Sequence, residues 1–121
     1  MNLKIIPGEF AVCKIPDLTQ FSPDDDFFFL CRTDEELSLV CRDNNVPGNC
    51  TDCEHGWSMF RVEGVLDFSL TGILSHLSGV LADAKVGIFA VSTYNTDYIL
   101  VKSENLDRAA EALRAAGHSI A

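Results

Sequence analysis

The second half of the chain combines helical and strand-like patterns of apolar residues. Between residues 69 and 84, apolar side chains recur with the i, i+3, i+4, i+7 spacing of an amphipathic helix. Residues 106–116 repeat this spacing, and Gly117 is placed to end the second helix. Between the helices, residues 86–93 are apolar on both faces, which predicts a central strand, and residues 98–102 predict a second, shorter strand.

Two outer strands complete the pattern in this half. Residues 59–65 alternate apolar and polar side chains, and residues 118–120 begin a last strand. The polar residues 95–97 predict a tight hairpin connection between the two inner strands. The resulting order over residues 57–121 is strand, helix, strand, strand, helix, strand, which is typical of a ferredoxin-like βαββαβ unit.

The first half of the chain is less regular. Its strand-like segments are residues 3–6, 9–15, 27–32 and 37–42. Residues 43–56 are rich in Asn, Gly, Cys and Asp and predict a loop. We interpret residues 1–56 as a shortened relative of residues 57–121 that lacks its helices and shares its core. The sequence therefore predicts an α+β fold of two ferredoxin-like units, the N-terminal one shortened.

Composition restricts the partners of such a fold. The chain has 121 residues, is 47% hydrophobic and carries a net charge of −9, which disfavours binding to nucleic acid or anionic membranes. We find neither a signal peptide nor the roughly 18 consecutive apolar residues that a membrane span requires. We therefore expect a cytoplasmic protein, whose five cysteines are mostly reduced thiols.

One cysteine motif raises the question of a metal site. Cys50 and Cys53 are spaced as Cys-x2-Cys, His55 follows closely and Cys41 precedes them, so soft ligands suited to zinc are present. A structural zinc site needs a second matched pair of ligands, and none is spaced correctly. A redox pair of Cys50 and Cys53 is disfavoured because no helix follows to lower a thiol pKa. We expect no metal and no cofactor.

The start of the first helix and the hairpin offer complementary charges. Helix-terminal amides at Thr71-Gly72 would accept an anion, and the Asp97 carboxylate would accept an ammonium group. Such a pair suits a small zwitterion. The alternatives are that Asp97 bonds only its own turn and that Gly72 only permits close packing. No nucleophile–base pair, P-loop or Rossmann pattern is present, so we expect no catalytic residues and no enzymatic activity.

The same segments carry a family resemblance. Residues 66–72 and 92–101 resemble the ACT domain of small bacterial tandem-ACT proteins, and the hairpin is similar to that of the CASTOR-type arginine sensors. Residues 33–40 also fit the bacterial group, and residues 43–56 are the weakest part of the match. The resemblance implies a regulatory module that senses small ligands, usually amino acids, at interfaces between ACT units.

The resemblance also implies a ligand site. Its residues in this chain are Asp67, Leu70, Thr71 and Gly72 at the helix start, Thr93, Tyr94, Thr96 and Asp97 in the hairpin, and Gly87 and Ile88 on a strand edge supplied by the partner unit. The arginine sensors have a glycine where this chain has Asp67. A carboxylate at that position would repel a ligand carboxylate or fill the pocket itself, which argues against arginine as the ligand.

The arginine sensors look like two fused copies of this chain. The resemblance therefore implies a homodimer that pairs through its C-terminal ACT units and has two equivalent sites. Ligand would act by favouring one arrangement of the units over another, and the output would pass through an unknown downstream protein. The alternative is a ligand-free interaction module whose pocket is filled by Asp67 and Tyr94.

Overall fold

The computed structural model describes residues 1–64 and 72–121. The chain divides into two compact units, which are described separately below. Unit 1 comprises Met1–Pro7 and Ser58–Ala121, and unit 2 comprises Gly8–Trp57.

Two long strands contribute residues to both units. These are β1 (Asn2–Lys14) and β4 (Asp52–Val62), which are neighbours in the sheet. The predicted boundary after residue 56 lies one residue from the end of unit 2, whereas the first seven residues belong to the unit that holds the C-terminal half. Strand β1 also continues through Pro7-Gly8, where two separate strands were predicted.

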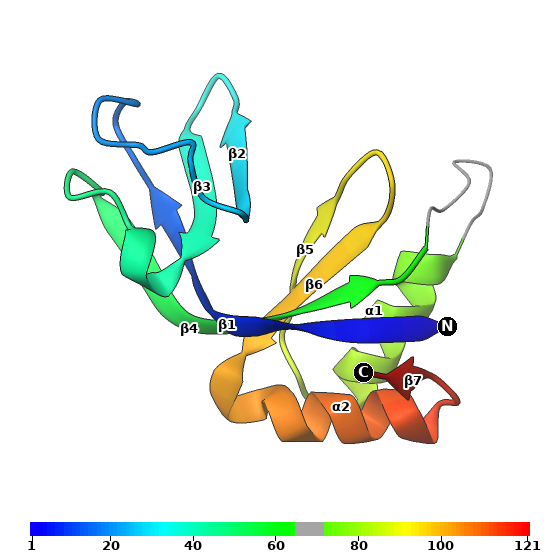
Figure 1. Cartoon of the computed structure of the whole chain (residues 1–121). Coiled ribbons are helices and arrows are strands. Elements are labelled where there is room, and N and C mark those ends of the chain that lie inside the picture. Colours follow the sequence, from blue (N-terminus) through cyan, green and yellow to red (C-terminus); the bar gives the residue numbers. More distant parts are fainter. Residues whose placement is uncertain (65–71) are drawn as a thin grey trace. The chain divides into compact units, whose positions relative to one another are not determined.

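Unit 1 contains both α-helices of the described chain (Figure 1). After β4 its elements are α1 (Ile73–Asp83), β5 (Phe89–Ser92), β6 (Asp97–Lys102), the 3-10 helix η2 (Ser103–Asn105), α2 (Leu106–Ala115) and β7 (Ser119–Ile120). Strand β6 lies between β4 and β5, and β7 pairs in parallel with β1. This arrangement confirms the predicted ferredoxin-like order, with β1 added between β4 and β7.

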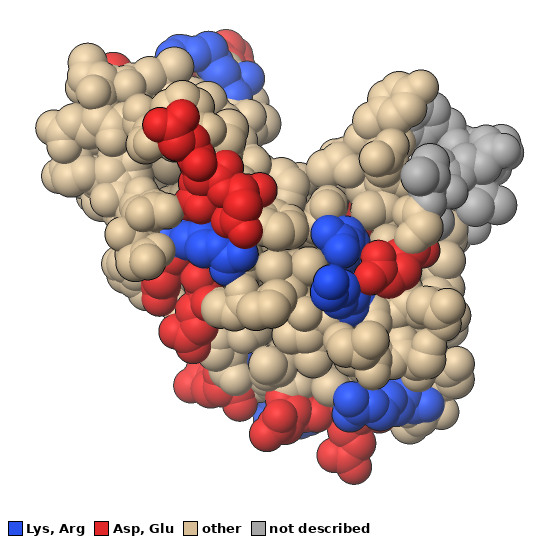
Figure 2. Space-filling model, viewed as in Figure 1, with Lys and Arg blue, Asp and Glu red and all other residues tan. Residues whose placement is uncertain are grey.

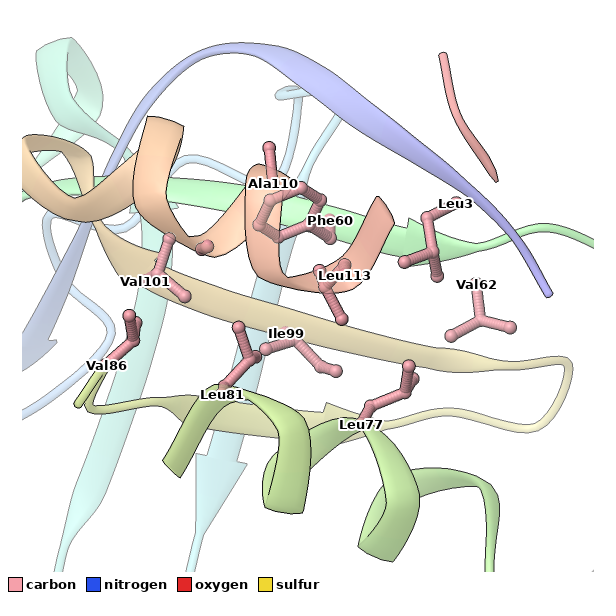
Figure 3. Close-up of a cluster of buried hydrophobic side chains, with 11 residues drawn as sticks. Leu3, Phe60, Val62, Leu77, Leu81, Val86, Ile99, Val101, Ala110 and Leu113 are labelled. Carbon is pink, nitrogen blue, oxygen red and sulfur yellow. The ribbon is translucent and has the colours of Figure 1, made fainter. Parts of the chain in front are cut away.

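Both helices bury the apolar stripe that their sequences predict. Leu77 and Leu81 of α1, which are four residues apart, are fully buried, and Leu113 of α2 is 1% exposed. They pack against residues of the sheet such as Phe60 and Ile99 (Figure 3). Burying each large apolar side chain contributes roughly 1.5–3 kcal/mol, so this cluster holds the helices on the sheet.

The predicted central strand over residues 86–93 is wrong in its place and its length. Strand β5 is the last strand in the sheet order, and within the described residues it pairs with β6 alone. Val86 is buried in the core before the strand begins, whereas Ala90 and Ser92 are exposed. The central position belongs to β6, whose Ile99, Leu100 and Val101 are at most 1% exposed.

Unit 2 is built from strands around a second, smaller core. Strands β2 (Phe28–Arg32) and β3 (Leu37–Arg42) form an antiparallel hairpin, and β3 pairs antiparallel with β1. A single 3-10 turn, η1 (Asp43–Asn45), follows β3, and residues 8–57 contain no α-helix. This confirms a shortened N-terminal unit. The predicted loop over residues 43–56 is too long, because β4 begins at Asp52.

Candidate functional site

Two threonines close the turn between β5 and β6. The Thr93 N–H and the Thr93 hydroxyl both donate to the Thr96 carbonyl, each at 2.9 Å. The Thr96 N–H donates to Thr93 Oγ1 at 3.3 Å. Asp97 follows as the first residue of β6, opposite Ser92. The turn therefore runs from Thr93 to Thr96, and Asp97 is held by strand pairing.

The side chain of Thr96 joins this turn to the neighbouring strand. Its hydroxyl donates to the Val62 carbonyl at 2.6 Å, and Thr96 is 5% exposed. A buried hydroxyl with a backbone acceptor is a structural contact that excludes water from the hydrogen bond. The hairpin turn is thereby fixed to the C-terminal end of β4. Figure 3 shows Leu77, near the start of α1, closer to this turn than Leu81.

Helix α1 begins after a glycine with a left-handed backbone. Gly72 has φ 81°, a conformation that residues with a Cβ adopt at a cost, and its carbonyl accepts the His76 N–H at 2.8 Å. Gly72, as the N-cap residue, has no side chain with which to bond the first-turn amides. The first-turn amides of an α-helix have no partner within the helix, and they carry its partial positive charge. Three predicted site residues, Asp67, Leu70 and Thr71, lie outside the described residues.

The remaining predicted site residues differ in how far their side chains reach solvent. Asp97 is half-buried and Tyr94 is 79% exposed, so both are accessible to a ligand. Gly87 is exposed and Ile88 packs partly against the core of unit 1, just before β5. The hydroxyls of the two threonines, by contrast, are already used within the turn and by Val62.

A second group of polar side chains meets in unit 2, and sequence analysis did not connect its members. Cys13 Sγ lies 3.2 Å from Cys53 Sγ, and Cys53 Sγ lies 3.3 Å from His55 Nε2. His55 Nδ1 lies 2.7 Å from a carboxylate oxygen of Asp43. The Cys-x2-Cys motif marked Cys53 and His55 in the sequence, but its pattern gave no reason to include Cys13.

Two histidines meet in unit 1. His76 Nε2 of α1 lies 3.0 Å from His118 Nε2, and His118 Nδ1 lies 3.1 Å from the Met1 amino group. Burial, the positive charge of the amino group and His76 together lower the pKa of His118. Burial is the largest of these causes, and it favours the neutral imidazole of His118.

Charges on the surface agree with the acidic composition. On the face drawn in Figure 2, Lys and Arg side chains lie in small groups among acidic ones and form no continuous basic stripe. No helix in the described parts of the chain has both the length and the apolar character needed to cross a bilayer.

Comparison with known families identifies the class of protein. Residues 52–115 match the model of the ACT domain, which is more than half of the chain, and residues 8–49 match the model of a separate N-terminal domain. The chain belongs to the ACT-domain family. No curated protein matches it. The narrower resemblance to the CASTOR-type arginine sensors stays a prediction.

Solved structures support the same fold over the whole chain. A protein from Agobacterium tumefaciens is 34% identical, with a TM-score of 0.85, and the match covers 99% of this chain and 91% of that one. The regulatory subunit of aspartate kinase from Thermus thermophilus, in its ligand-free form, is 10% identical with a TM-score of 0.62 and covers 97% and 98% of the two chains. The allosteric aspartate kinase of Clostridium acetobutylicum is 15% identical with a TM-score of 0.66, and the match covers 94% of this chain and 33% of the kinase.

Proposed function

We propose that this protein is a cytoplasmic regulatory module that binds a small amino acid and acts by ligand-biased pairing of ACT units in a homodimer. The observation that carries the proposal is the hairpin turn Thr93–Thr96, which is anchored to β4 and is followed by the half-buried Asp97 as the first residue of β6. Membership of the ACT-domain family supports a ligand-binding rather than a catalytic role.

The chemistry of the two elements suits a zwitterion. The start of α1, where the N-cap residue is Gly72, supplies backbone N–H groups and partial positive charge, which favour the ligand carboxylate. The Asp97 carboxylate is half-buried, so it would accept the ligand ammonium from a partly desolvated position. A hydrogen bond to a charged group contributes roughly 1.5–3 kcal/mol. One contact to the ligand carboxylate and one to the ligand ammonium would together fix the orientation of a small zwitterion.

The edge strand β5 supports pairing with a second copy. Strand β5 is the last in the sheet order, so the backbone groups on its outer side are placed to pair with another strand. Gly87 and Ile88 lie directly before this strand, where the family resemblance expects contacts from the partner unit. A twofold pairing would create two equivalent sites, and a ligand bound at the interface would stabilise the pair.

The ligand is found by measuring the melting temperature of the protein with each of the twenty amino acids. A ligand at a hundred times its Kd stabilises the folded protein by about 2.7 kcal/mol. If no amino acid raises the melting temperature, the ligand-free interaction module is the better description, and the output still passes to another protein.

Calorimetric titration with the amino acid so found then tests the role of Asp97. Asp97→Asn keeps the shape of the side chain but removes the charge, so affinity should fall about ten- to a hundredfold. Asp107→Asn, an exposed acidic residue in the first turn of α2, is the matched control and should bind as the wild type does. Equal affinities for wild type and Asp97→Asn would remove Asp97 from the site.

A further inference from the structure

Four side chains of unit 2 form a continuous chain of contacts that the proposed ligand site does not use. Cys13 lies in β1, Cys53 and His55 lie in β4, and Asp43 lies in η1. The links are Cys13 Sγ to Cys53 Sγ at 3.2 Å, Cys53 Sγ to His55 Nε2 at 3.3 Å, and His55 Nδ1 to Asp43 Oδ1 at 2.7 Å. The contacts therefore run from two thiols to an imidazole and from the imidazole to a carboxylate.

Asp43 determines which nitrogen of His55 carries the proton. An ionised carboxylate can only accept hydrogen bonds, so His55 Nδ1 must donate to it. In the neutral imidazole this leaves Nε2 as an acceptor, and Nε2 is the nitrogen that faces the Cys53 thiol. A nucleophile beside a base, with the base oriented by a third group, is the arrangement that activates thiols in enzymes.

The two thiols differ in their access to solvent. Cys13 is 3% exposed and belongs to the core of unit 2, whereas Cys53 is half-buried and His55 is exposed. Burial raises the pKa of both thiols, so both are neutral at rest, and Cys53 needs a base to take its proton when it reacts. A small oxidant therefore meets Cys53 first, on the side where His55 can assist.

Cys13 is placed to resolve the oxidised form of Cys53. The two sulfurs are already 3.2 Å apart, against about 2.05 Å in a disulfide. Two other thiols compete, because the Cys50 thiol interacts with Cys53 and the buried Cys41 thiol interacts with Cys13. Among the described residues, no group of three or more His, Cys, Asp or Glu is arranged to hold a metal ion.

We propose that Cys53 is a site of oxidation by hydrogen peroxide, that His55 serves as its base, and that Cys13 closes a reversible disulfide with it. The Cys53 sulfur attacks one peroxide oxygen and passes its proton to His55 Nε2. The O–O bond breaks, and the departing hydroxide takes that proton from His55, which yields a sulfenic acid and water. The Cys13 sulfur then attacks the sulfenic sulfur, and the S–O bond breaks. The second hydroxide leaves with the Cys13 proton as water. Two thiols lose two electrons, and the peroxide gains them.

The first test identifies the bond. The full-length Cys31→Ser protein, which lacks the exposed thiol of β2, is reduced, treated with hydrogen peroxide and blocked with N-ethylmaleimide. Cleavage before Asp52 separates Cys50 from Cys53, so peptide masses show which of them is linked to Cys13. The expected product is the Cys13–Cys53 disulfide, which dithiothreitol reverses. Any other disulfide among Cys13, Cys41, Cys50 and Cys53, or four thiols that all carry N-ethylmaleimide, would overturn the proposal.

The second test measures the role of the base. In a His55→Asn variant of the same protein, peroxide should form the same disulfide at least about tenfold more slowly at neutral pH, because general-base assistance is lost. A Cys13→Ala variant should stop at the sulfenic acid, which dimedone traps on Cys53. An unchanged rate in the His55 variant would show that the histidine has no part in the reaction. Circular dichroism confirms that each variant is folded before its rate is compared.

Discussion

The hydroxyl of Thr96 should contribute measurably to stability, because it is the buried contact between the β5–β6 turn and β4. Thr96→Val keeps the size and branching of the side chain but removes the donor to the Val62 carbonyl. A lost hydrogen bond costs about 0.5–1.5 kcal/mol, and a buried acceptor left without a donor raises the cost to about 1–3 kcal/mol. With Thr96 only 5% exposed, water has little access to the carbonyl that is left behind. We therefore expect the free energy of unfolding to fall by about 1–3 kcal/mol.

Urea denaturation of wild type and Thr96→Val measures this loss. The midpoint should fall while the slope of the free energy with urea stays unchanged, because the variant exposes the same surface on unfolding. Thr96→Ser, which keeps the hydroxyl and loses one methyl group, is the matched control and should cost about 0.8 kcal/mol. If Thr96→Val is as stable as the wild type, or Thr96→Ser is the less stable of the two, the contact to Val62 does not hold the turn.

Two further predictions concern assembly and pH. Ala90→Lys places a charge on the edge strand β5, so light scattering should show a 13.3 kDa monomer of the variant in place of the wild-type dimer. A wild type that is itself monomeric at micromolar concentration would contradict the proposed pairing. The pKa of His118 is lower in the folded protein than in the unfolded chain, where it is about 6.5. The neutral imidazole therefore contributes to stability at pH values above about 6.5. This contribution is lost as the pH falls through the pKa of the folded state. The wild type should therefore lose stability between pH 7.5 and pH 5, whereas His118→Gln should show a flatter profile in urea denaturation at each pH.

The helices could be predicted from the sequence because their apolar spacing has one structural solution. Leu77 and Leu81 are four residues apart and can both face a core only in a helix, and both are fully buried. Gly117 could be identified as a stop because it supplies the left-handed backbone that ends α2, and its φ is 97°. These features depend on residues close together in the chain.

The position of β5 could not be predicted in the same way. Apolar residues on both faces of 86–93 suggested a strand with neighbours on both sides. In the structure Val86 fills the core from an irregular segment, while Phe89 and Val91 are half-buried at the end of the sheet order. An apolar residue indicates that its position is buried, but it does not indicate which element packs against it.

The candidate site residues also divide into those with a local sequence signal and those brought together only by the pairing of strands. The hairpin and the helix start could be identified because each has a local signal: a polar turn in one case and a helix start with glycine in the other. The contacts among Cys13, Cys53 and Asp43 depend on which strands are neighbours and in which register, and no short motif encodes that. The Cys-x2-Cys spacing directed attention to Cys50 as the partner of Cys53, whereas the pairing of β1 with β4 brings Cys13 within 3.2 Å of it from forty residues away. Alternation along β1 places Cys13 on the same side as Ala11, and both belong to the core of unit 2 together with Ile15, which follows the strand. The order of the strands, rather than any local pattern, decides that β4 brings Cys53 to this side.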